Sequence, residues 1–178
     1  MTPATDRLDS RSARSRHMAR VESLDALIGA HPDALRDHYF TGSPTDPTAL
    51  SRIGNVPGRL LALEPLSPAF VLTRSLVRAL GNHSVLWRGK TFESGGTAGA
   101  DQVLGGLRVR FRCEVDASRL DDEPALVFRY DDLGNGWPWS RTYWELRDVA
   151  DGIAIGPVFF ETATGPRVLC WYGLETNV

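Results

Sequence analysis

The stretch from Leu107 to Val115 constrains the fold of this chain more than any other segment. It reads Leu-Arg-Val-Arg-Phe-Arg-Cys-Glu-Val, so apolar and charged side chains alternate over nine residues. Successive side chains point to opposite faces of a β-strand, and the pattern therefore predicts a strand with one apolar and one charged face. Such a strand buries one face against a core and leaves the other in solvent.

The same two-residue period recurs through the second half of the chain. From residue 85 onward, turn-rich segments separate the periodic ones and no gap is long enough for a helix, so neighbouring strands there must be antiparallel. The further strands are predicted over residues 59–64, 85–93, 125–131, 141–148, 153–162 and 167–174, with one more hidden in the segment 94–106. A mainly β fold follows, an antiparallel meander of about seven or eight strands that closes most simply into a barrel without free edges. A two-sheet sandwich is the alternative.

The N-terminal part of the chain shows a different pattern. Residues 1–20 are rich in Ser, Thr, Arg and Asp and are predicted to be a disordered tail. Residues 21–178 are predicted to form a single domain that opens with short helices, one capped by Ser23 and one over residues 31–40 with Pro32 in its first turn.

A longer helix is predicted over residues 67–80. Ser67 provides its N-cap, Pro68 follows at the first helical position, and a broad apolar face runs along the segment. We expect this helix to pack on the outside of the barrel, over the outward-facing Leu169 and Trp171.

The strand phases predict which side chains face the interior when charged neighbours such as Arg88 and Lys90 are placed outside. The inward set combines aromatic rings with a few neutral polar groups, which is typical of a small-molecule site. Its members are Trp87, Thr91, Phe111, Phe128, Tyr130, Thr142, Trp144 and Tyr172. Two alternatives remain open: side chains fill a barrel of this size completely, or a register shift reverses the two faces.

The segment Trp-Arg-Gly-Lys-Thr-Phe at 87–92 and the closing strand resemble the calycin superfamily of lipocalin-like barrels, over residues 56–176. Lipocalins carry a Trp on an early strand, but their Gly two residues before it is replaced here by Val85. The resemblance extends to small actinobacterial barrel cyclases of polyketide pathways, and the Arg, Ala, Gly and Asp usage suits a high-GC bacterium. It implies a calycin-like barrel that binds a small apolar, polyketide- or lipid-like molecule.

The composition of the chain limits the classes of partner and cofactor that we expect. The net charge is −2, and no basic block appears in the folded part, which argues against nucleic acid. No apolar run is long enough to span a membrane, and no secretory signal is visible, so a cytoplasmic protein is expected. The two cysteines, Cys113 and Cys170, are predicted to be inert core thiols. The four histidines lack metal-ligand spacing, so we expect no metal and no cofactor.

Candidate catalytic residues are Tyr130, Tyr172 and Glu93. A phenol aimed at a substrate carbonyl is most effective in a water-free interior. Glu93 and Asp101 flank a glycine-rich segment expected to be a loop at the barrel mouth, where burial raises a carboxyl pKa for acid–base work. The candidate substrate-binding residues are Trp87, Thr91, Phe111, Phe128, Thr142 and Trp144.

Three functional hypotheses follow. The first is a cofactor-independent cyclase or isomerase that holds a flexible substrate in a reactive fold. The second is a non-catalytic carrier of a hydrophobic small molecule. The third is a filled barrel whose outer residues Leu169 and Trp171 bind another protein or a second copy of the chain as a homodimer.

Overall fold

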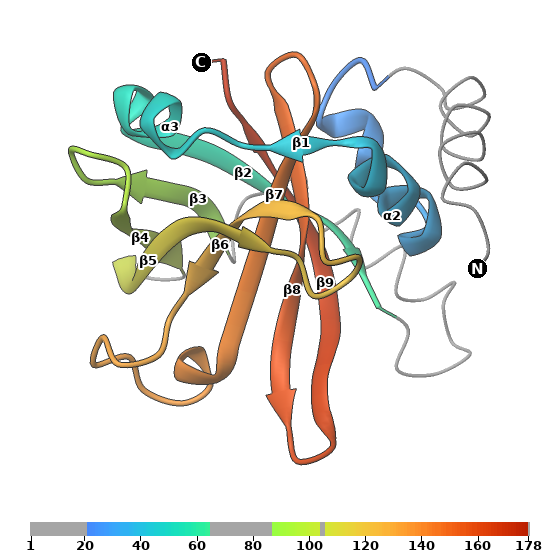
Figure 1. The fold of residues 1–178 in the computed structure, drawn as a ribbon. Helices are drawn as coiled ribbons and strands as arrows, with labels where there is room; N and C mark the ends of the chain where they lie inside the picture. Colours follow the sequence, from blue (N-terminus) through green and yellow to red (C-terminus); the bar gives the residue numbers. More distant parts are fainter. Residues whose placement is uncertain (1–20, 65–86, 104–105, 178) are drawn as a thin grey trace, which may run out of the picture.

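A computed structural model describes residues 21–64, 87–103 and 106–177, and these residues are mainly β (Figure 1). The predicted tail at 1–20 and the predicted helix at 67–80 lie outside the described residues. Within the described ranges, no helix has the length and apolar character needed to cross a membrane.

Eight strands form a closed antiparallel barrel. Each strand pairs with the next along the chain, and β9 returns to pair with β2. The strands are β2 (Asn55–Leu63), β3 (Trp87–Phe92), β4 (Ala98–Val103), β5 (Leu107–Ala117), β6 (Pro124–Arg129), β7 (Thr142–Ala150), β8 (Ile153–Thr162) and β9 (Gly165–Glu175). The predicted barrel is confirmed, and the sandwich alternative is wrong. A two-residue strand β1 (Ser43–Pro44) adds to β7 on the outside.

The hidden strand predicted within 94–106 is β4. The glycine-rich segment is therefore not the mobile loop expected from its composition. Gly95 and Gly96 form the tight turn between β3 and β4, and Gly99 lies in β4 directly against the Phe111 ring.

Short helices precede the barrel. Ser23 Oγ accepts a hydrogen bond from the Ala26 amide at the start of a 3-10 helix η1 (Asp25–Leu27). The helix α2 (Pro32–Thr41) begins with its proline as predicted, because proline lacks the amide hydrogen that the first turn leaves unpaired. A further helix α3 (Pro47–Ile53), capped by Asp46, was not predicted from the sequence.

The barrel encloses one apolar cluster, and α3 packs into it at one end through Leu50. A second apolar cluster lies between α2 and the outer face of the barrel. The loop between β6 and β7 and the turn between β8 and β9 lie at the other end, away from α3 (Figure 1). The barrel therefore has one end closed by a helix and one end bounded by loops.

Trp171 belongs to the outer cluster, and the prediction that it forms part of a partner-binding face is wrong. Its side chain is fully buried, its ring packs edge-on against Tyr39 of α2, and its Nε1 donates to Glu64 at 3.0 Å. The N-terminal helix α2 thus contacts Trp171, where the sequence predicted the helix over residues 67–80. Leu169 remains exposed over 36% of its surface.

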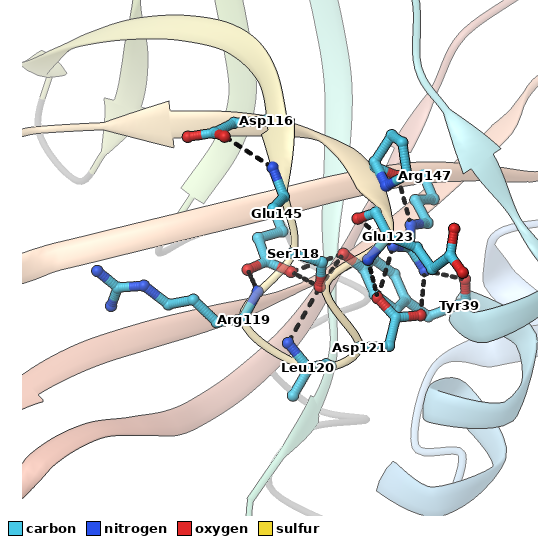
Figure 2. A network of polar contacts seen from close by, with 11 residues as sticks. Tyr39, Asp116, Ser118, Arg119, Leu120, Asp121, Glu123, Glu145 and Arg147 are labelled. Atoms are coloured by element: carbon cyan, nitrogen blue, oxygen red, sulfur yellow. Dashed lines mark hydrogen bonds and ion pairs between the residues drawn. The ribbon is translucent and has the colours of Figure 1, made fainter. Parts of the chain in front are cut away.

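Polar contacts fasten α2 and the β5–β6 loop to β7 (Figure 2). The Glu145 carboxylate accepts hydrogen bonds from Tyr39 Oη and Ser118 Oγ, each at 2.6 Å, and from the Arg119 amide at 2.7 Å. Arg147 makes a bidentate ion pair with Asp121 at 2.7 and 2.8 Å. Glu145 and Arg147 face outward from the barrel, but the helix and loop bury them.

A β-bulge in β3 reverses the predicted facing of the residues that follow it. The pairing with β4 shifts between Trp87 and Gly89, so one extra residue enters β3 and its later side chains change face. Lys90 therefore points into the barrel, and Thr91 points outward, where its hydroxyl accepts from Gln102 at 2.7 Å. The prediction that Thr91 faces the interior is wrong for this reason.

Gly89 permits the bulge. Its φ of +130° is a conformation that L side chains rarely adopt, and a Cβ there would lie 2.1 Å from the Val56 carbonyl oxygen. Gly58 on β2 provides room for the inward ring of Trp87, since a Cβ there would lie 2.3 Å from that ring.

Candidate functional site

A polar group made of Lys90, Asp101 and Tyr130 lies inside the barrel. Lys90 on β3 and Asp101 on β4 are direct cross-strand partners, and Tyr130 follows the end of β6. Lys90 Nζ donates to the two Asp101 carboxylate oxygens at 2.9 and 3.1 Å and to Tyr130 Oη at 2.6 Å. The Tyr130 hydroxyl donates in turn to the Asp101 carboxylate. All three residues are at most 1% exposed.

Aromatic rings surround the Lys90 ammonium. Its Nζ lies 4.0 Å from the ring centre of Trp144 and 4.3 Å from that of Phe128. Four further rings have centres between 4.8 and 5.9 Å from the same atom, those of Phe111, Tyr130, Tyr172 and Trp87. Aromatic faces attract a cation, and the attraction grows when water is absent. The ammonium therefore has electrostatic partners on several sides without solvent.

Two indole groups at this site differ in their hydrogen bonding. Trp87 Nε1 donates to Asp101 Oδ1 at 2.8 Å. Trp144 Nε1 is buried and finds no acceptor within the part of the chain that the structure describes. Leaving a buried donor unpaired is costly, so this N–H is suited to an acceptor atom supplied by a ligand. The Tyr172 hydroxyl, by contrast, already donates to the Glu145 carbonyl oxygen at 2.8 Å.

Burial changes the acid–base properties of the group. Loss of water lowers the pKa of Lys90, although the Asp101 carboxylate acts in the opposite direction. Burial and the nearby Asp101 charge raise the pKa of Tyr130 well above its usual value, and burial likewise raises that of Tyr172. Burial therefore favours the neutral form of all three side chains, and at Lys90 the Asp101 carboxylate opposes this effect.

The structure brings together most of the residues predicted for the site. Those in the barrel interior are Trp87, Phe111, Phe128, Tyr130, Trp144 and Tyr172. Thr91 is outside, and Thr142 is half-buried with its hydroxyl donating to the Trp139 carbonyl oxygen at 2.8 Å. Glu93 is exposed on the turn after β3, away from the interior group. Whether these residues act on a substrate stays a prediction.

Sequence reasoning missed the charged pair at the centre. Lys90 was placed outside because the bulge was not foreseen, and Asp101 was placed at the barrel mouth rather than in its interior. One signal was available: Lys90 is the only lysine in this sequence, whose other basic side chains are all arginines. A single lysine beside a glycine that breaks the strand period indicates a special position.

The fold and the site define a class: a small closed antiparallel β-barrel with a buried lysine–aspartate–tyrosine group in an aromatic interior. No family model matches the chain, and no curated protein does. One solved structure, the crystal structure of a protein from Thermomonospora curvata, is similar over 94% of this chain and 97% of that chain, with a TM-score of 0.49 and 14% identity. Its description names no activity.

Proposed function

We propose that this protein binds a small apolar molecule with a carbonyl group inside its barrel and acts on it as a cofactor-independent isomerase or cyclase. The observation that carries the proposal is the juxtaposition of a titratable group, Lys90, Asp101 and Tyr130, with the unpaired N–H of Trp144 in an aromatic interior. A mostly apolar lining with a few placed polar groups is typical of small-molecule sites.

Each polar residue of the site has its own role in the proposed reaction. Trp144 Nε1 donates a hydrogen bond to the carbonyl oxygen, which polarises the carbonyl and acidifies the neighbouring C–H. Asp101 receives the proton from that carbon and returns it to the same or a neighbouring carbon. Lys90 and Tyr130 donate to Asp101 and hold its carboxylate in place. Such preorganised donors are most effective where water is excluded.

Binding requires movement of the rings. Trp87, Trp144 and Tyr172 pack against one another with centroids 4.7 to 5.6 Å apart. Trp87 is only half-buried, so it provides the route by which an apolar molecule reaches the interior. The ligand then replaces ring–ring contacts by ring–ligand contacts.

Deuterium exchange of 4-phenyl-2-butanone tests the proposal. This apolar ketone exchanges the hydrogens beside its carbonyl slowly in neutral deuterium oxide, and proton NMR follows the loss. We expect the protein to accelerate the exchange and Tyr130→Phe to slow it, because the Asp101 carboxylate loses one of the donors that hold it in place. Trp144→Phe should weaken binding and slow the exchange by about 100-fold, the usual effect of losing one preorganised donor to the carbonyl oxygen. Trp137→Phe is the matched control, because Trp137 is 78% exposed on the β6–β7 loop.

Calorimetric titration with the same ketone separates the outcomes. Butylbenzene, which has a similar shape without the carbonyl, should bind less tightly by up to about tenfold, the contribution of one hydrogen bond. Saturable binding without exchange supports the carrier hypothesis in place of catalysis. The absence of both binding and exchange would overturn the proposal as a whole.

A further inference from the structure

The only lysine of the sequence lies at the centre of the barrel. All other basic residues are arginines, and every one of them in the described ranges has access to solvent or an ion pair or hydrogen bond at the barrel's outer side. Arginine supplies positive charge and ion pairing as well as lysine does, but its guanidinium stays protonated. Lysine differs in that its amine loses its proton when buried and then acts as a nucleophile.

Removal from water favours the neutral amine of Lys90, whereas the surrounding rings and the Asp101 carboxylate attract its ammonium form. Its Nζ is held among six aromatic rings and is fully removed from water. The Asp101 carboxylate at 2.9 Å is the acceptor to which a proton of the ammonium can pass. That transfer leaves an amine and a carboxylic acid, two neutral groups, in place of two charges in an apolar interior.

We propose that Lys90 forms an imine with an aldehyde or ketone ligand inside the barrel. The inference rests on the proposed function, since it names the covalent step at the same site. It makes the ligand class a reactive carbonyl compound with an apolar body that fits among the rings. It also assigns a role to the unpaired Trp144 N–H, which lies on the ring closest to Nζ and is suited to hold the carbonyl oxygen.

The step balances without an outside reagent. The Lys90 amine attacks the carbonyl carbon, the C=O pair moves to the oxygen, and that oxygen takes the proton held by Asp101. The nitrogen then returns one proton to the Asp101 carboxylate and gives the other to the hydroxyl group, which leaves as water when the C–O bond breaks, so the products are an imine and one water. Neither the Lys90 nitrogen nor the carbonyl carbon is oxidised or reduced overall. Exclusion of water from the closed interior slows the reverse hydrolysis.

Reductive trapping tests the inference on the full chain. The probe is cinnamaldehyde with sodium cyanoborohydride, which reduces an imine to a stable amine and leaves the free aldehyde intact. Intact mass spectrometry reads the added cinnamyl group, and peptide mapping separates Lys90 from the N-terminal amine. Because the sequence has one lysine, no other side chain carries a primary amine that could form the reduced imine adduct, and peptide mapping distinguishes it from conjugate addition to the two cysteines.

Arg88→Lys provides the matched comparison within one molecule. Position 88 is exposed and lies two residues before Lys90 on the same strand, so the variant carries an ordinary solvated lysine beside the buried one. We expect Lys90 to be trapped faster than the lysine at position 88 at neutral pH, because burial lowers the pKa of Lys90 and so raises the fraction of neutral amine. Asp101→Asn should slow trapping at Lys90, because it removes the proton donor to the carbonyl oxygen, and leave trapping at position 88 unchanged.

The outcomes are distinguishable. Faster labelling of Lys90 than of the lysine at position 88 supports imine formation. Labelling at position 88 with none at Lys90 overturns the inference, and it leaves the proposed function standing if 4-phenyl-2-butanone still binds and exchanges. Lys90→Met serves as a second variant, because it replaces the amine by an unbranched apolar side chain of similar length. Loss of trapping in a folded Lys90→Met protein confirms the site of attachment.

Discussion

Replacing Asp101 by asparagine leaves the Lys90 ammonium buried without its countercharge. In the native barrel the two carboxylate oxygens lie 2.9 and 3.1 Å from Nζ, and both residues are at most 1% exposed. Removing one partner of a buried ion pair costs about 3–5 kcal/mol, because the remaining charge stays desolvated. For a chain of this length that corresponds to a fall of roughly 6–20 °C in the unfolding midpoint.

The stability lost in Asp101→Asn depends on pH, and the direction of this dependence follows from the Lys90 pKa. Burial lowers the Lys90 pKa in the folded state, so the unfolded chain binds more protons below about pH 10. Stability therefore rises with pH in the window between the folded and unfolded pKa values of Lys90. Without Asp101 the folded value falls further and the window widens. The deficit of Asp101→Asn should thus be largest near neutral pH and narrow toward pH ~10.

Urea unfolding monitored by tryptophan fluorescence measures these differences, with Lys90→Met and the double variant completing a cycle. The double variant should be more stable than the sum of the single losses predicts, by more than ~1 kcal/mol, because neither charge is left alone. Losses that simply add, or an Asp101→Asn protein within ~1 kcal/mol of the original, would refute the buried ion pair.

Three further predictions concern other parts of the molecule. Gly89→Ala should cost at least ~2 kcal/mol in urea unfolding, since the bulge needs its positive φ and has no room for a Cβ, whereas Gly136→Ala on an open loop is the neutral control. Tyr39→Phe should cost ~1–3 kcal/mol by removing a donor to the buried Glu145 carboxylate, and an unchanged midpoint would contradict the network in Figure 2. Burial raises the pKa of Cys113 to about 12, so its thiol should resist Ellman's reagent at pH ~8 until the chain unfolds, and rapid reaction of the native protein would show that it is accessible.

The strand pattern alone determined much of the fold. The period of two, the turn residues between the segments and the absence of helix-length gaps were sufficient for the antiparallel meander, because each is a local property of consecutive residues. The predicted strand over 153–162 agrees with β8 (Ile153–Thr162), and the aromatic interior of Phe111, Phe128 and Trp144 follows from the same alternation.

Tertiary structure decided what occupies the centre of the barrel. A bulge is a mismatch between two strands, so neither strand's own period reveals that Lys90 turns inward after Gly89. The pairing of Lys90 with Asp101 likewise depends on the register between β3 and β4, which no local pattern specifies. Trp171 is covered by α2, an element more than a hundred residues away in the chain, because long-range packing buries surfaces that their own strand leaves bare. Alternation thus determines which residues share a face, while register and packing determine which face meets water and which charges meet each other.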